Sequence, residues 1–137
     1  MAGRRSSIEG GDDRTSARGF DGITARGVPH PRTYGTFPRV FGRYVRQRRV
    51  FENAEAVRRM TSLPAALFGL HERGIIAPGM HADIVIFDDE RIVDRATYEN
   101  PFVAPDGMRD VYVNGRAVLR DTVLTGTRPG RVLRNGR

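Results

Sequence analysis

The side chains of this sequence that could take part in chemistry centre on one histidine and one arginine. His30 and Arg32 belong to a His-Pro-Arg motif, and a guanidinium can hold a carboxylate through two parallel hydrogen bonds. The other histidines, His71 and His81, lie in turn-like segments, where we expect structural or solvated side chains. With three histidines, no cysteine, no His-x-His and no histidine pair at ligand spacing, the sequence cannot assemble the three or four ligands of a catalytic zinc.

The positive charge of the chain is concentrated near its N-terminus. Residues 1–50 hold 11 Arg against four acidic residues, whereas residues 51–137 hold 12 Arg against 12 acidic residues, so the net charge of +7 is N-terminal. All 23 basic residues are Arg, a bias more typical of a GC-rich gene than of phosphate recognition, and we expect no nucleic-acid partner. No apolar run approaches the roughly 20 residues of a membrane span, so we expect a cytoplasmic protein without a membrane partner.

The length of the chain limits its fold. A chain of 137 residues can form one domain with a modest core, but a complete (β/α)8 barrel typically needs about 250 residues. Residues 1–19 consist largely of Arg, Ser, Gly and Asp, which cannot bury enough surface to offset the entropy of ordering. We expect this segment to be disordered.

A helix is predicted over residues 36–49, where Thr36 can serve as the N-cap and Pro38 is compatible with a first turn. Apolar residues recur there at helical spacing, with arginines on the remaining surface. This pattern favours an outer helix packed on a sheet, although it also permits a basic amphipathic helix lying on an anionic membrane. The apolar stripe consists of Phe37, Val40, Phe41, Tyr44 and Val45.

Two shorter helices are predicted to follow. The first starts from a cap at residue 52 or 53 and continues to about Thr61, with Glu55 placed to pair with Arg58 or Arg59. The second occupies about residues 62–69. We expect the first helix to bury Ala56, Val57 and Met60. The second should make apolar contacts through Leu63, Leu67, Phe68 and Leu70.

The C-terminal half of the chain is predicted to form β structure. Residues 82–88 are apolar and β-branched, which indicates a strand with little solvent exposure. Asn114-Gly115 is a strong hairpin signal, because a type I′ turn needs positive φ at both central residues. A last extended piece is expected at 121–124. Residues 91–100 are expected to be irregular or to form a short helix, and residues 101–107 to form a loop.

Several motifs together resemble one enzyme family. The stretch GLHERGIIAPGMHADIVIFDD is similar to the C-terminal signature of the amidohydrolase superfamily. The runs HPRTYGTFPRVFGRYVR, AVRRMTSLPA, VYVNG and TGTRPGRVLR resemble the D-aminoacylase family of N-acyl-D-amino-acid deacylases, collinearly over about residues 20–134. The most specific part is His-Pro-Arg followed by Gly-Thr-Phe-Pro-Arg.

The resemblance implies an α/β fragment made of the last helices of an amidohydrolase (β/α)8 barrel and part of a C-terminal β-sandwich subdomain. Residues 20–70 would form the end of the barrel and residues 71–134 the small β-subdomain. Residues 1–19 would be a non-family N-terminus and residues 135–137 a tail. A truncated or frameshifted gene is the simplest account of this arrangement.

The resemblance also implies an activity. Members of the family are zinc-dependent hydrolases of carbon–nitrogen bonds other than peptide bonds, and they cleave N-acyl-D-amino acids to a carboxylate and a free D-amino acid. Zinc would polarise the carbonyl and activate water while a carboxylate moves the proton. The family's metal ligands lie upstream of the matched region, so we expect the isolated chain to be inactive.

Three site residues follow from the resemblance. Asp21 matches the catalytic Asp of the family's Ser-Asp-Gly, with Phe20 in place of the serine; its alternative role is that of a turn residue before Gly22. His30 and Arg32 match a loop expected near the mouth of the site, where Arg32 would bind the carboxylate of the D-amino acid. Alternatively, both side chains pin that loop through backbone carbonyls.

Two other functions remain compatible with the sequence. The chain could be a non-catalytic subunit of a split deacylase that binds a separately encoded barrel through the helix at 36–49. It could also be a basic binding module, whose binding to nucleic acid or anionic lipid would be sensitive to salt.

Overall fold

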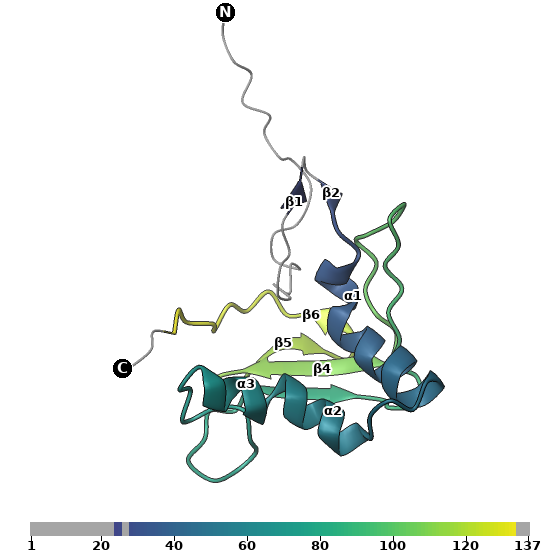
Figure 1. Ribbon diagram of the computed structural model, residues 1–137. Helices are drawn as coiled ribbons and strands as arrows, with labels where there is room; N and C mark the ends of the chain where they lie inside the picture. The colour runs from purple at the N-terminus through teal and green to yellow at the C-terminus, as the bar shows by residue number, and fades with distance from the viewer. Residues whose placement is uncertain (1–23, 26–27, 134–137) are drawn as a thin grey trace, which may run out of the picture.

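The computed structural model describes residues 24–25 and 28–133, in which helices occupy the N-terminal half and an antiparallel sheet the C-terminal half (Figure 1). The predictions for residues 1–19, Asp21 and residues 135–137 lie outside the described residues. None of the described helices is long and apolar enough to cross a membrane. The elements are β1 (Thr24–Ala25), β2 (Val28–Pro29), α1 (Arg32–Arg39), the π-helix η1 (Val40–Gln47), α2 (Asn53–Met60), α3 (Ser62–Leu67), β3 (Ile84–Phe87), β4 (Met108–Val113), β5 (Arg116–Arg120) and β6 (Val123–Leu124).

Helix α1 begins four residues before the predicted start, so the prediction of Thr36 as N-cap was wrong. Pro31 occupies the N-cap position, and its carbonyl accepts the backbone N–H of Gly35 at 3.0 Å. The hydroxyl of Thr36 donates to the carbonyl of Arg32 at 2.6 Å, a bond made within a formed helix. Arg32 is therefore the first helical residue instead of a loop residue.

The helical backbone widens after Pro38, which lies inside α1 and has no N–H to donate. Hydrogen bonds in η1 span five residues, as between the N–H of Arg48 and the carbonyl of Arg43 at 2.9 Å. Because the predicted stripe assumed one α-helical repeat, it holds only in part. Phe41 is buried, but the side chain of Phe37 is 45% exposed.

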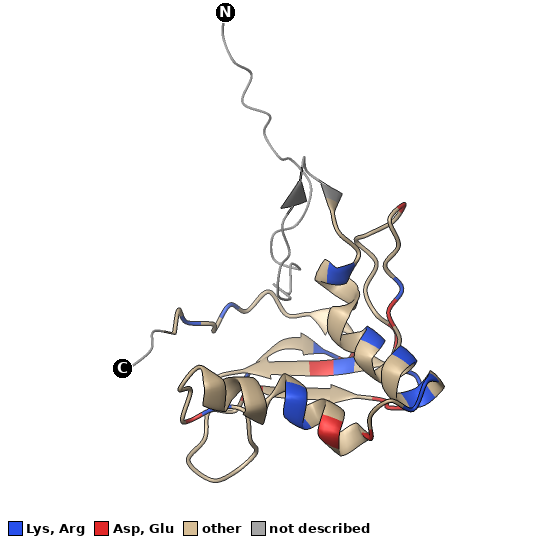
Figure 2. Ribbon diagram, in the orientation of Figure 1, with Lys and Arg blue, Asp and Glu red and all other residues tan. Residues whose placement is uncertain are grey.

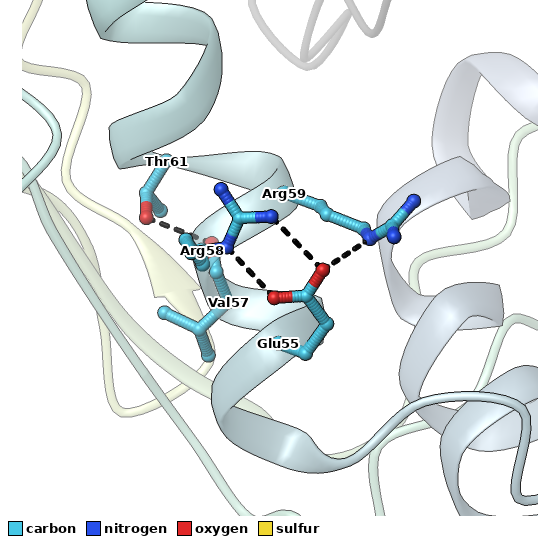
Figure 3. Close-up of polar contacts among 5 residues, drawn as sticks. All are labelled: Glu55, Val57, Arg58, Arg59 and Thr61. Carbon is cyan, nitrogen blue, oxygen red and sulfur yellow. Dashed lines mark hydrogen bonds and ion pairs between the residues drawn. The ribbon is translucent and has the colours of Figure 1, made fainter.

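Helix α2 agrees with its predicted bounds, and its charged face pairs as expected (Figure 3). Glu55 accepts from the guanidinium of Arg58 at 2.7 and 3.0 Å and from that of Arg59 at 2.7 Å. These bonds lower the pKa of Glu55 from 4.5 to about 2. The apolar prediction was right for Ala56, which is fully buried, and for Met60, which packs on the core; it was wrong for the exposed side chains of Val57, Leu67 and Phe68.

The four strands β3 to β6 form one antiparallel sheet in sequence order. The hairpin prediction is confirmed, because Asn114 and Gly115 join β4 to β5 with φ values of 49° and 75°. The prediction of little exposure for β3 was wrong: Val85 is 51% exposed. The other three residues of this edge strand, Ile84, Ile86 and Phe87, are half-buried.

The core lies between the helices and the sheet, and its centre includes a residue that the sequence did not indicate. Ile92 is 1% exposed and clusters with Phe41 and Ala56. It comes from residues 91–107, which join β3 to β4 without a helix and extend alongside α1 (Figure 1). Further side chains packed on this cluster are Val40, Val45, Phe51, Met60, Phe87 and Met108.

Candidate functional site

A pocket of about 480 Å³ lies where the start of α1 faces residues 91–107. Helix α1 contributes Arg32, and the opposite wall contributes Tyr98. Both side chains are exposed, so they are accessible to a solute. The remaining lining residues are His30, Pro31, Gly35, Thr36, Arg39, Val40, Tyr44, Asp94, Ala96, Thr97 and Glu99.

The imidazole of His30 is held at both ring nitrogens. Its Nδ1 accepts the backbone N–H of Arg32 at 3.1 Å, and its Nε2 lies 2.9 Å from the hydroxyl of Tyr98. The His30 and Tyr98 rings meet edge to face, with 5.0 Å between centroids. The first N–H groups of a helix have no intrahelical acceptor, so His30 satisfies one of these groups at the start of α1.

The wall of the pocket is fixed to the helix by two arginines. Arg39 binds the carboxylate of Asp94, with Nε to Oδ2 at 2.7 Å, and the Asp94 side chain is largely buried. Arg46 donates to the backbone carbonyls of Asp89 at 2.7 Å and Ile92 at 2.9 Å. Charge-assisted bonds of this kind are stronger than neutral ones, so they hold residues 89–94 against the helix.

Two glycines, Gly35 on α1 and Gly42 on η1, allow this close approach. A Cβ placed on Gly35 would lie 3.0 Å from the Cβ of Asp94. A Cβ on Gly42 would lie 3.0 Å from the carbonyl oxygen of Ile92 and 3.3 Å from the Cα of Val93. The neighbours of Gly42 include backbone atoms, so a larger residue there would crowd the chain itself, whereas at Gly35 the Asp94 side chain would have to shift.

A second hollow, of about 460 Å³, adjoins the pocket and is more basic. Arg43 on η1, Arg48 directly after η1 and Arg95 on the opposite wall all line this hollow. Blue segments mark arginine positions along the helical stretch that begins with α1 (Figure 2). Arg95 also faces Asp106 at 3.5 Å. These side chains are solvent-exposed, so their charges are well screened.

A separate polar cluster fixes the β4–β5 turn. Asp83 accepts the backbone N–H of Asn114 at 2.8 Å and also pairs with Arg73. The side chain of Asn114 accepts from Arg73 at 2.7 Å and donates to the carbonyl of Pro129 at 2.7 Å. The cluster joins three chain segments and lines neither hollow, which indicates a structural role.

The β5–β6 turn depends on one buried carboxylate. Asp110 accepts the backbone N–H of Asp121 at 2.8 Å and the Nε of Arg109 at 2.9 Å. The first of these bonds, followed by the second, lowers the pKa of Asp110. Asp121 has a φ of 48°, so the carboxylate stabilises a turn in the left-handed region.

The structure brings two of the three predicted site residues together. His30 and Arg32 share the pocket, whereas Asp21 lies outside the described residues. Sequence reasoning missed Tyr98 and Asp94, because each comes from an irregular segment more than 50 residues away from its partner. Their only sequence cue is polarity within that segment.

The described residues do not fit a catalytic metal. They contain no group of three or more His, Cys, Asp or Glu side chains able to hold an ion. Both ring nitrogens of His30 are engaged as described above, and the Nε2 of His81 lies 3.2 Å from Glu72. The chain offers no cysteine to supplement them.

Comparison with known proteins finds relatives among the D-aminoacylases and N-acyl-D-glutamate deacylases. The chain is 47% identical over 116 residues to the N-acyl-D-glutamate deacylase of Alcaligenes xylosoxydans xylosoxydans, covering 85% of this chain and 24% of the relative. It is 50% identical to a D-aminoacylase mutant solved in complex with copper chloride, with a TM-score of 0.75, covering 78% of this chain and 23% of that structure. The N-acyl-D-glutamate deacylase of Bordetella bronchiseptica, complexed with zinc and a phosphonate inhibitor, gives 50% identity and a TM-score of 0.66, covering 67% of this chain and 19% of that structure.

These matches show the family, and they cover most of this chain but only part of each relative. The chain spans about a quarter of the length of the curated relatives it matches. The amidohydrolase family model matches residues 19–119, which is most of the chain. The chain belongs to the amidohydrolase family.

Proposed function

We propose that this chain supplies the C-terminal part of a metal-dependent amidohydrolase that cleaves the amide bond of N-acyl-D-amino acids. The observation that carries the proposal is its 50% identity and TM-score of 0.75 to a solved D-aminoacylase. The products would be a carboxylate and a free D-amino acid. The chain is then one part of a longer catalytic unit.

The two halves of the chain have different places in that unit. Residues 20–70 form the end of a (β/α)8 barrel, and residues 71–134 form part of a β-sandwich subdomain. In support, the helices α1 to α3 fall within the first range, and the sheet β3 to β6 falls within the second. The core between them keeps the barrel end attached to the sheet.

Arg32 recognises the carboxylate of the D-amino acid. Arg32 is the first residue of α1, so the partial positive charge of the helix N-terminus lies beside the same pocket. Its guanidinium adds two parallel hydrogen-bond donors. His30 supports it by accepting the backbone N–H of Arg32. Every N-acyl-D-amino acid carries this carboxylate beside the amide that is cleaved, so the contact would hold any member of the substrate class.

Asp21 moves the proton between the attacking water and the leaving amine. Zinc, present in the Bordetella relative, would be held by residues outside this chain and would supply the activation of water and carbonyl. The described residues offer no group of ligands for it. We therefore expect the purified chain, with zinc added, to release no D-glutamate from N-acetyl-D-glutamate.

The test is a chimera in which residues 20–134 replace the matching part of the Alcaligenes N-acyl-D-glutamate deacylase. The chimera should release D-glutamate, and Asp21→Asn should abolish this activity. Arg32→Lys should lower kcat/KM by about 10- to 100-fold through KM, as expected for losing a charged hydrogen-bond pair. The matched control is Arg43→Lys, an exposed arginine on the same helical segment that does not line the pocket.

Three results would contradict the proposal. Equal kinetics of Arg32→Lys and Arg43→Lys would remove the carboxylate role of Arg32. Full activity of Asp21→Asn would exclude it as the proton-transfer group. Release of D-glutamate by the isolated chain would show that the metal ligands do not have to come from elsewhere.

A further inference from the structure

We infer that Tyr98 is a positioning residue for carboxylate recognition: acting through the ring of His30, it fixes the backbone from which Arg32 reaches into the pocket. This inference rests on the proposed function of Arg32. It adds a third residue to the recognition site, on a segment that the His-Pro-Arg motif does not include. The contact joins residues 68 positions apart in the sequence.

The backbone N–H of Arg32 sets the direction of both hydrogen bonds to the ring of His30. The backbone N–H of Arg32 only donates, so Nδ1 of His30 must be the unprotonated nitrogen. In a neutral ring the proton is then on Nε2, which donates to the Tyr98 hydroxyl 2.9 Å away. The hydroxyl keeps its own proton, which it can donate to a molecule in the pocket that it lines.

The ring of His30 is thereby restrained at opposite sides. One bond runs to the start of α1, and the other runs to the wall of the pocket. Without the hydroxyl of Tyr98, the ring keeps only one of these restraints and can rotate away from the N–H of Arg32. The bond from that N–H to Nδ1 would then be lost, and the start of α1 would fray.

Tyr98 can exert this restraint because its own backbone is anchored. Four residues before it, Asp94 binds Arg39, and one residue before it, Thr97 exchanges hydrogen bonds with Asn100 at 3.1 and 3.0 Å. The side chain is nevertheless 72% exposed. Removing its hydroxyl therefore changes the pocket without disturbing the core.

The experiment compares Tyr98→Phe with the wild-type chain by ¹⁵N NMR above neutral pH, where histidine rings are uncharged. The first readout is the Nε2 proton of His30, which should give a resonance in the wild type and be lost to solvent exchange in the variant. The second is the dissociation constant of N-acetyl-D-glutamate, followed at Nε of Arg32. Binding should weaken about threefold to tenfold, the usual effect of one hydrogen bond. Tyr112→Phe, on β4 and outside the pocket, is the matched control and should behave as the wild type.

The outcomes separate the two proposals. If Arg32→Gln abolishes binding but Tyr98→Phe binds as tightly as the wild type, the role of Tyr98 is wrong and the role of Arg32 stands. If the wild type does not bind the probe, or Arg32→Gln binds it equally well, the proposed function of Arg32 fails. In that case the Nε2 resonance still tests the contact: its persistence in Tyr98→Phe would overturn the restraint that we assign to Tyr98.

Discussion

Ile92→Ala should be among the most destabilising single substitutions in the described part of the chain. The side chain of Ile92 is 1% exposed and packs with Phe41 and Ala56 at the junction of helices and sheet. Alanine removes three buried carbon atoms, which costs about 2.4 kcal/mol at about 0.8 kcal/mol each. The cavity left behind raises the expected loss to about 3–4 kcal/mol, and Ile92→Val should lose about 1 kcal/mol.

The assay is urea unfolding followed by circular dichroism, in which the midpoint should fall without a change in slope. Val57→Ala is the control, because Val57 is also aliphatic but lies exposed on α2. It should change the free energy of unfolding by less than about 0.5 kcal/mol. A loss of under about 1 kcal/mol for Ile92→Ala, or an equal loss for Val57→Ala, would refute the assignment of the core to this junction.

Three further substitutions test the close packing, the turn and the ion pairs, each by unfolding experiments. Gly42→Ala should lower the free energy of unfolding by about 1–2 kcal/mol, because crowding against the Ile92 carbonyl outweighs the gain of about 1 kcal/mol in helix propensity. Its control is Gln47→Ala, exposed on the same helix η1, which should show no loss. Asn114→Ala should be about 1–2 kcal/mol less stable than Asn114→Gly, since both lose the side-chain bonds but only alanine is strained at a φ of 49°; equal stabilities would exclude strain. Because the pKa of Glu55 is lowered from 4.5 to about 2, its ion pairs should stabilise the fold fully above pH 4.5 and lose this effect as pH falls toward 2. Glu55→Gln should remove that part of the pH dependence of Tm. A Tm profile that Glu55→Gln leaves unchanged would contradict this role of the ion pairs.

The parts of the fold that sequence predicted well are those specified by neighbouring residues. The Asn114-Gly115 turn needs two residues that tolerate positive φ, and the pairing of Glu55 needs only helical spacing. The prediction of Thr36 as the N-cap was wrong because a threonine hydroxyl can either cap a helix or bind a preceding carbonyl within it. The helix α1 instead begins after Pro31. Local chemistry therefore predicted element types better than their first residues.

The parts that sequence could not predict depend on contacts between distant segments. Ile92 sits in a stretch without periodicity, so nothing local indicates that it is buried. The apolar run around Val85 likewise indicates a strand but not how much of each side chain the other segments cover. For the candidate site, the motif predicted His30 and Arg32, but Tyr98 is adjacent only in space.

The contact between His30 and Tyr98 also bears on the order in which the molecule folds. It closes a loop of 68 residues, whereas the β4–β5 hairpin closes over a two-residue turn, so the hairpin has much the smaller entropy of closure to overcome. We expect the hairpin to form early and the recognition pocket late. By the same reasoning, the start of α1 should be among the first regions to open in the native state, and its amide hydrogens should exchange faster than those of β4. The carboxylate site that we propose would thus be among the least cooperative parts of the described fold, and bound carboxylate should slow its opening.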